Sequence, residues 1–308
     1  MYLWIPRKYV RSTKKRKTCF PFALCSLICS LTSLKIRSLD KEKKNRFSFC
    51  FVLAYLYLCM MISKNLTKYI KSLENKKVRK TEKRFIAEGP KVVADLMERH
   101  EPSLLVAVEG WYQQHHLTPR EQDCVVTEEE LRKVSLLQHP QQVLALFPIP
   151  ETILPSLDDS SLVIALDGVQ DPGNMGTIIR IADWFGITTL VCSRETADIF
   201  NPKCVQATMG SIARVNVVYT DLEEWLETLP ANYPVYGTFL NGNNIYKETL
   251  TNHGIIIMGN EGNGISDKIG RHVNKRLLIP NYPEGRPTAD SLNVAIATAI
   301  TCAEFRRR

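Results

Sequence analysis

The sequence predicts an α/β protein in two parts, a small α/β domain at residues 61–155 and a doubly wound parallel-sheet domain at residues 156–308, each with its own core. A continuous apolar run at residues 162–166 ends at Asp167 and Gly168, which is typical of a strand buried on both faces of a parallel sheet. Further apolar runs follow it with helical segments between most of them. A shorter alternation of the same kind precedes it, and the proline-containing stretch at residues 148–155 is predicted to be a linker.

Residues 1–60 differ from the rest of the chain in charge and in cysteine content. They contain 13 of the 40 Lys and Arg residues, only two acidic residues, and five of the nine Cys residues. An apolar run at residues 47–62 is 16 residues long, which is short for a membrane-spanning helix of about 20 residues. Residues 1–60 are either an upstream or disordered extension that is not part of the functional protein, or a membrane anchor. The change of composition at Met61 favours the extension.

The remaining 248 residues carry 27 basic and 30 acidic side chains. The positive formal charge of the chain, +8, therefore comes entirely from residues 1–60, which we call the leader. This balance says little about what the globular part binds. Its four Cys residues lack zinc-site spacing and are predicted to be small buried hydrophobes in a reducing compartment. The histidines at positions 115, 116 and 139 are too scattered for a metal site. We therefore expect no metal ion, a cytoplasmic location, and no membrane contact unless the leader is an anchor.

The first domain is predicted from alternating helical and strand-like segments. The predicted helices are residues 62–73, 92–97, 111–116 and 128–136, and the predicted strands are residues 85–89, 104–108, 123–126 and 143–147.

Nine Lys and Arg residues crowd the first helix and its exit, between Lys64 and Arg84. Such a concentration could contact phosphates, and the candidate RNA-binding residues within it are Lys76, Lys77, Arg79 and Lys80. A solvated helical face is the alternative for these side chains.

The second domain is predicted to contain strands at residues 162–166, 188–192, 215–219, 235–239, 255–258 and 277–279. Ligands bind such sheets at the carboxyl ends of the strands. Three unusual segments lie at these ends, and each is open to a plain structural explanation.

The first segment runs from Asp171 to Arg180. Asn174 is placed where a helix should begin, and Arg180 lies off the apolar stripe of that helix. The structural alternative is an N-cap asparagine with a surface arginine that pairs with Asp183.

The second segment, residues 259–264, has three glycines in six residues immediately after a strand, so its backbone can approach a ligand closely. It matches neither the dinucleotide fingerprint nor a P-loop. The alternatives are a tight turn without a ligand and a Glu261 that caps the following helix.

The third segment is Ile279 and Pro280 after a strand, then Ser291, Leu292 and Asn293 at the start of the last helix. Ser291 alone would be an ordinary N-cap. The last helix is small and apolar nearly all round, as expected for a helix buried in a core or an interface.

Together, in this order and spacing, the three segments resemble the motifs of the SpoU/TrmH family of RNA ribose methyltransferases in the SPOUT superfamily. The match covers residues 160–308, and residues 85–91 resemble the substrate-binding domain that often precedes it. Two departures stand out: Ala295 replaces a common serine, and the segment at residues 281–290 is longer and contains proline.

The resemblance implies a trefoil-knotted methyltransferase domain, S-adenosyl-L-methionine as the methyl donor, and a homodimer whose interface uses the last helix. Arg180, alone or together with an RNA phosphate, would promote deprotonation of the ribose hydroxyl. Residues Asn174, Glu261, Ser291 and Asn293 would orient Arg180, the ribose and the loops. The implied cofactor-binding residues are Phe239, Gly259, Asn260, Gly262, Ile279, Pro280 and Leu292.

The expected function is therefore 2′-O-methylation of a ribose in structured RNA, with ribosomal RNA favoured over transfer RNA. The alternative is an RNA-binding protein on the same fold without catalysis.

Overall fold

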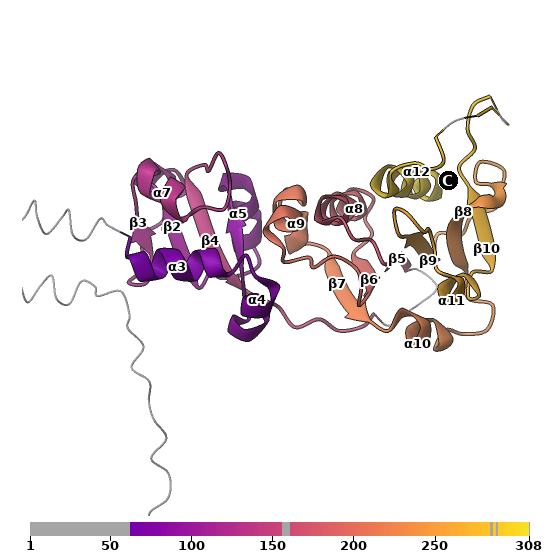
Figure 1. Cartoon of the computed structure of the whole chain (residues 1–308), viewed down its shortest axis with the longest axis horizontal. Coiled ribbons are helices and arrows are strands. Elements are labelled where there is room, and N and C mark those ends of the chain that lie inside the picture. Colours follow the sequence, from indigo (N-terminus) through magenta and orange to yellow (C-terminus); the bar gives the residue numbers. More distant parts are fainter. Residues whose placement is uncertain (1–61, 156–160, 284–285, 288, 308) are drawn as a thin grey trace, which may run out of the picture. The chain divides into compact units, whose positions relative to one another are not determined.

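The computed structural model describes residues 62–155, 161–283, 286–287 and 289–307. The leader and Met61 lie outside these residues, so both interpretations of the leader stay predictions. All helices and strands below belong to one compact unit (Figure 1).

A four-stranded sheet forms in the first part of this unit, with the strand order β1-β4-β2-β3. Strand β4 is antiparallel to β1 and β2, and β2 is parallel to β3. The strands are β1 (Arg84–Glu88), β2 (Leu104–Ala107), β3 (Cys124–Val125) and β4 (Val143–Pro148). The helices are α3 (Lys64–Ser72), α4 (Lys76–Glu82), α5 (Pro90–Met97), α6 (Glu109–Gln114) and α7 (Glu128–Val134).

The predicted small α/β domain is thus present, with one addition. The basic segment expected to be the exit of the first helix forms a separate helix, α4, capped by Asn75 through a hydrogen bond from Lys77 N to Asn75 Oδ1 of 2.8 Å.

A six-stranded sheet in the order β10-β8-β9-β5-β6-β7 forms the second part, and every neighbouring pair in it is parallel. The strands are β5 (Leu162–Asp167), β6 (Thr189–Ser193), β7 (Asn216–Thr220), β8 (Val235–Asn244), β9 (Gly254–Gly259) and β10 (Lys275–Leu278). The helical elements are α8 (Pro172–Trp184), α9 (Pro202–Ala207), η1 (Ser211–Ala213), α10 (Leu222–Glu227), α11 (Asp267–Gly270) and α12 (Val294–Arg306). The predicted parallel-sheet α/β class is confirmed.

Side chains that alternate along the strands fill the two faces of this sheet. On β5, Ile164 and Leu166 belong to the apolar cluster that contains residues of α8, α9 and α12, whereas Val163 and Ala165 pack with residues of α10 and α11. Helices therefore cover both faces, and the central strand β5 is buried along its whole length. This explains why its sequence is a continuous apolar run.

Each part has an apolar cluster of its own, and a third cluster contains residues of both parts. One face of the four-stranded sheet packs with α3 and α7 in its own cluster. The other face, through Phe85, Ala87 and Leu105, belongs to the same apolar cluster as Ile164 and Leu166 of the six-stranded sheet. The boundary between residues 155 and 156 stays a prediction, as does the knot.

None of the helices in the described part of the chain has the length and apolar character needed to cross a membrane.

Candidate active site

The three sequence motifs meet at the carboxyl edge of the six-stranded sheet. Asp167, the last residue of β5, is the register partner of Gly259, the last residue of β9. Strand β8 pairs with β9 on its other side, and Phe239 lies two residues beyond the last of these pairs, Gly237 with Ile257. The glycine loop and the segment that leads into α8 therefore leave the sheet at one edge, and Phe239 lies within β8 beside it.

Helix α8 begins three residues earlier than predicted. Its N-cap is Asp171, whose Oδ1 accepts a hydrogen bond of 2.9 Å from Asn174 N, and Pro172 occupies the first helical position. The prediction of Asn174 as the N-cap is therefore wrong. Because Asp171 does the capping, the Asn174 amide is available for other partners.

The Asn174 side chain joins the other two motifs. Its Nδ2 donates a hydrogen bond of 3.0 Å to Oε1 of Glu261, and its Oδ1 accepts one of 3.0 Å from Nδ2 of Asn293. The three residues lie 87 and 119 positions apart in the chain. We call this chain of hydrogen bonds, Glu261–Asn174–Asn293, the motif bridge.

Glu261 is held as a carboxylate at one end of the motif bridge. Besides Asn174, it accepts backbone hydrogen bonds from Gln170 N at 3.2 Å and Asp171 N at 3.3 Å. Burial raises the pKa of this carboxyl, but the hydrogen bonds from Asn174 and from backbone N–H groups outweigh it and leave the pKa below its ordinary value. Glu261 does not cap α11, whose N-cap position is Ser266.

Asn293, not Ser291, is the N-cap of the last helix. Its Oδ1 accepts hydrogen bonds from Ala295 N at 3.0 Å and Ile296 N at 3.3 Å, while its Nδ2 serves the motif bridge. The prediction of Ser291 as the cap is therefore wrong, and Ser291 is an exposed residue of the preceding loop.

Helix α12 runs parallel to α8 and beside it (Figure 1). Asn293 contacts the first turn of α8, and at the other end Arg306 Nε donates a hydrogen bond of 2.9 Å to Phe185 O. The motif bridge thus fixes the starts of two neighbouring helices to each other.

Arg180 is exposed on the outer face of α8, six residues beyond Asn174. The alternative in which Arg180 pairs with Asp183 is wrong, because Asp183 binds Arg214 at 2.9 Å. Within the described ranges, no hydrogen bond or ion pair of the Arg180 guanidinium is present. Its charge is therefore available to a substrate that approaches this face.

The glycine loop is shaped by its own contacts. A Cβ on Gly259 would lie 2.2 Å from the backbone of Gly264 and Ile265, so only glycine fits there. Asn260 donates a hydrogen bond of 2.7 Å to Gly168 O, and its Oδ1 accepts from Gly262 N at 2.9 Å and Asn263 N. The Asn260 side chain is thus used to build the loop, and the exposed part left for a ligand is backbone.

The other predicted cofactor residues line the same edge in different ways. Phe239 is half-buried, and the guanidinium of Arg276 lies 3.6 Å from its ring centroid, so that face of the ring is occupied. Ile279 and Pro280 are half-buried immediately after β10, and Leu292 is 51% exposed.

The predicted RNA-binding residues divide into two groups. Lys76, Lys77 and Lys80 are exposed and, with Asn75 and Thr81, line an open depression of about 550 Å³ on α4. Arg79 is only 2% exposed, and its guanidinium binds protein groups, so the prediction that it contacts RNA is wrong.

Sequence reasoning missed Asp171 and Lys203. Lys203 of α9 forms an ion pair of 2.8 Å with Asp171 and, with the Asn174 N–H, holds the pKa of that carboxyl below its usual value. An aspartate directly before a proline at a helix start was the available signal for the cap. No sequence signal pointed to Lys203, 32 residues away.

The four cysteines of the described residues show the predicted burial only in part. Cys192, Cys204 and Cys302 are buried, and burial raises the pKa of each thiol, whereas Cys124 is half-buried. Among the residues that the structure describes, no group of three or more His, Cys, Asp or Glu side chains could hold a metal ion.

Comparison with known proteins identifies the family. The model of the SpoU rRNA methylase family matches residues 161–303, and that of the MRM3-like substrate binding domain matches residues 64–145. The chain is 32% identical over 248 residues to the 23S rRNA (guanosine(2553)-2′-O)-methyltransferase RlmP of Bacillus subtilis (strain 168), a match that covers 77% of this chain and 94% of RlmP.

The chain belongs to the SpoU rRNA methylase family. A solved TrmH-family structure from Porphyromonas gingivalis is similar, with 38% identity, a TM-score of 0.71, and coverage of 80% of this chain and 99% of that one. The AdoMet-bound rRNA methyltransferase from Sinorhizobium meliloti matches with 30% identity, a TM-score of 0.69, and coverage of 80% and 96%. The resemblance found in the three motifs is confirmed, and with it the enzyme class of this SpoU methylase.

Proposed function

We propose that this SpoU methylase transfers a methyl group from S-adenosylmethionine to a ribose 2′-hydroxyl of ribosomal RNA. The observation that carries the proposal is the motif bridge, because it brings Glu261, Asn174 and Asn293 together beside the helix that bears Arg180. Ribosomal RNA is the preferred substrate class because the similar RlmP is a 23S rRNA methyltransferase.

The residues at the carboxyl edge fit a cofactor that is held by backbone groups. Gly259 permits a loop that no larger residue could form, and the loop side chain Asn260 is turned inward. The AdoMet complex of the similar rRNA methyltransferase confirms this methyl donor for the family. We assign Gly259, Gly262, Ile279, Pro280 and Leu292 to the cofactor site. Asn260 supports this site by holding the glycine loop, and Phe239 is a further candidate.

The sulfonium of S-adenosylmethionine supplies an activated methyl group, so the protein has to orient the ribose hydroxyl and assist loss of its proton. An arginine keeps its positive charge in water and is a poor base there. Arg180 therefore acts by binding a phosphate beside the target ribose and stabilising negative charge on the attacking oxygen. As the hydroxyl oxygen bonds to the methyl group, the carbon–sulfur bond breaks, and the hydroxyl proton is released to water.

The motif bridge has the positioning role. Glu261 orients the Asn174 amide, and Asn174 and Asn293 keep the starts of α8 and α12 in register. Ser291 lies two residues before this cap, in the exposed loop, where its hydroxyl is accessible to a substrate.

The RNA is bound in addition by the depression on α4. Lys76, Lys77 and Lys80 place three ammonium groups around it, and such groups bind phosphates with release of counterions. The match of the substrate binding domain model over residues 64–145 supports this assignment.

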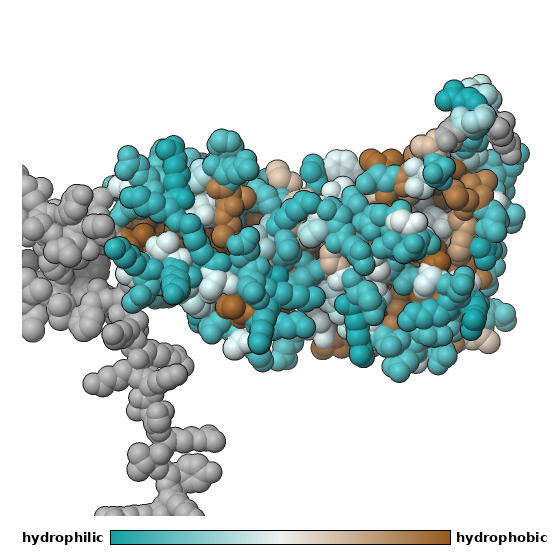
Figure 2. All heavy atoms as spheres, in the orientation of Figure 1, coloured by the Kyte–Doolittle hydropathy of each residue, from teal (hydrophilic) through white to brown (hydrophobic). Residues whose placement is uncertain are grey.

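The protein acts as a homodimer through α12 and its neighbour α8. Ile296 of α12 is 53% exposed and Trp184 of α8 is 85% exposed, although both are large and apolar. Figure 2 shows hydrophobic residues at the surface where α12 lies in Figure 1. Light scattering on the purified protein tests the dimer; a monomer at micromolar concentration contradicts it.

The cytoplasmic location, the knot, and the domain boundaries stay predictions. Cell fractionation tests the first.

The decisive experiment for the function is transfer of labelled methyl groups to ribosomal RNA, followed by mapping of the modified nucleotides. Calorimetry with S-adenosylmethionine separates an enzyme from an RNA-binding protein on the same fold, because only the enzyme requires the methyl donor. Cofactor binding together with 2′-O-methyl product supports the proposal; absence of both contradicts it.

A further inference from the structure

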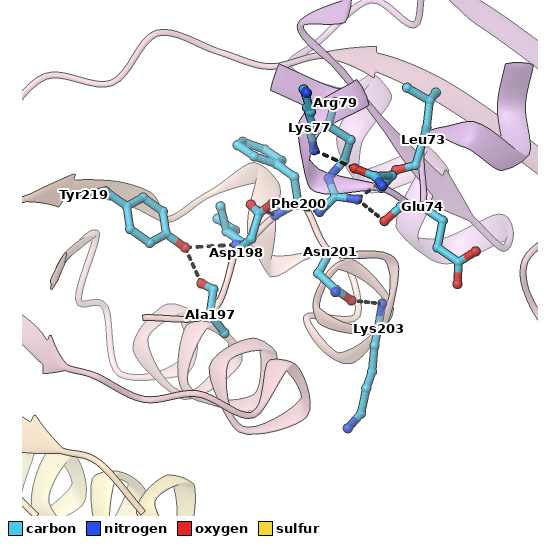
Figure 3. A network of polar contacts seen from close by, with 12 residues as sticks. Leu73, Glu74, Lys77, Arg79, Ala197, Asp198, Phe200, Asn201, Lys203 and Tyr219 are labelled. Carbon is cyan, nitrogen blue, oxygen red and sulfur yellow. Dashed lines mark hydrogen bonds and ion pairs between the residues drawn. The ribbon is translucent and has the colours of Figure 1, made fainter. Parts of the chain in front are cut away.

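Arg79 is the one member of the predicted RNA-binding group whose side chain is directed into the protein. Its Nη1 donates hydrogen bonds to Leu73 O at 2.8 Å and Glu74 O at 2.6 Å, at the end of α3. Its Nη2 forms an ion pair of 2.7 Å with Asp198, 119 residues further along the chain (Figure 3). The guanidinium thus joins α3 and α4 to the segment between β6 and α9.

The segment around Asp198 is itself firmly attached to the six-stranded sheet. Asp198 Oδ1 accepts a hydrogen bond of 3.0 Å from Phe200 N, and the Tyr219 hydroxyl of β7 donates to Ala197 O and accepts from Ile199 N (Figure 3). Ala197 N donates to Val169 O at 2.8 Å. The segment is therefore bonded to the chain immediately after β5.

Val169 precedes the residues that hold the motif bridge. The next two N–H groups, of Gln170 and Asp171, donate to Glu261. A second route leads to the same place, because α9 follows the Asp198 segment and its Lys203 forms the ion pair with Asp171. Helices α8 and α9 are also closely packed, because a Cβ on Gly176 of α8 would lie 2.5 Å from Cys204 O of α9.

We infer that Arg79 and Asp198 form a positioning pair, which couples the α4 surface to the active-site segment at residues 169–174. This inference rests on the proposed function, since it takes α4 as the RNA-binding helix. Arg79 and Lys80 are neighbours in α4, so an RNA held by Lys76, Lys77 and Lys80 acts on the helix whose buried side is bonded to Asp198. In this arrangement the RNA contact supports the orientation of Glu261 and Asn174 at a distance.

Attachment of α4 to the Asp198 segment does not by itself require a buried ion pair. Apolar contact already joins the same segments, because the rings of Phe85 in β1 and Phe200 lie 4.7 Å apart. A buried ion pair adds little net stability over apolar residues of the same volume, since both charges lose their hydration. What it adds is a fixed, directional link that an aromatic contact lacks.

The test compares Asp198→Asn with Lys80→Gln in the full chain. Asp198→Asn keeps the shape of the side chain and its Oδ1 acceptor while it removes the charge opposite Arg79. We expect single-turnover methyl transfer at saturating RNA and cofactor to fall about tenfold, as for loss of one charge-assisted hydrogen bond, with the Kd values for RNA and cofactor within twofold of wild type. Lys80→Gln should weaken the Kd for RNA, because a phosphate contact is lost. Lys91→Gln loses only an exposed ion pair with Asp95 and is the control, which should leave the rate and both Kd values unchanged.

Amide hydrogen exchange supplies a readout that does not depend on catalysis. Exchange at residues 169–174 should be faster in Asp198→Asn and in Arg79→Met than in wild type, and unchanged in Lys80→Gln. If Asp198→Asn keeps both the wild-type rate at saturation and the wild-type exchange, the pair only contributes to folding and the inference is wrong. If wild type itself methylates no RNA, the proposed function fails, and the exchange data still decide whether the coupling exists.

Discussion

Two polar networks in this protein join segments that are far apart in the chain, and they differ in their exposure to water. The motif bridge links Glu261, Asn174 and Asn293 in hydrogen bonds among exposed groups at the sheet edge. The Arg79–Asp198 pair is buried, with side-chain exposures of 2% and 16%. Exposed hydrogen bonds can be exchanged for water at little cost in stability, whereas a buried charge that loses its partner is costly. The exposed network should therefore control activity, and the buried one should control both activity and stability.

The largest effect is expected at Arg180, which belongs to the exposed side of this comparison. Arg180→Ala should lower single-turnover methyl transfer at least about 100-fold, because a charge-stabilising group is lost. The free energy of unfolding should change by no more than about 0.5 kcal/mol, since the side chain is exposed on α8. Arg180→Lys should not restore the rate, because a point charge cannot replace a planar fork. A near wild-type rate for Arg180→Ala would show that the residue is only part of a solvated face.

The glycine loop allows the backbone contribution to cofactor affinity to be measured separately from that of the side chains. Gly259→Ala should destabilise the loop by about 1–3 kcal/mol, because the new Cβ would lie 2.2 Å from backbone atoms, and cofactor affinity measured by calorimetry should fall accordingly. Gly110→Ala in α6 is the control outside the cofactor site, since a Cβ there would have open space around it. Equal affinities for the two variants would contradict a backbone-built cofactor site.

The exposed lysines of α4 should bind RNA phosphates, whereas the buried Arg79 should not. Replacing Lys76, Lys77 and Lys80 together by Gln should reduce the dependence of log Kd for RNA on log salt by roughly 2, because each phosphate contact contributes about 0.7–0.9. The cofactor Kd and the unfolding midpoint should not change. The same triple replacement at Lys64, Lys68 and Lys71 of α3 is the control. An equal change in slope for these residues would show that RNA binding is not specific to the depression on α4.

The smallest effect is expected from pH. The pKa values of Asp171 and Glu261 are both lowered in the folded protein, so their stabilising contribution is present above their ordinary values of 3.8 and 4.5 and is lost as pH falls through the lowered values. Cofactor binding should therefore be constant from about pH 7 to pH 5 and weaken only below pH 4. Glu261→Gln should remove part of this acid loss. Weakening already between pH 7 and pH 5 would show that another group controls the loop.

Local patterns predicted the main elements well because the apolar period is a local property. The run at residues 162–166 is β5, and the runs at 188–192 and 215–219 agree with β6 and β7 within a residue. Helix starts were less accurate, since Asn174 and Ser291 both have cap-forming side chains but Asp171 and Asn293 form the caps. Several polar residues compete for such a position, and packing of the helix selects one of them.

The sequence by itself indicated the family, because Asn174, Arg180, Glu261 and Asn293 occur in the order and spacing of its motifs. It also determined the parallel sheet, whose central strand must be apolar on both faces. Only the tertiary structure decided which polar groups meet. Arg79 and Lys80 are adjacent and equally basic, yet one is buried against Asp198 and the other is exposed, because the partner that buries Arg79 comes from a segment 119 residues away.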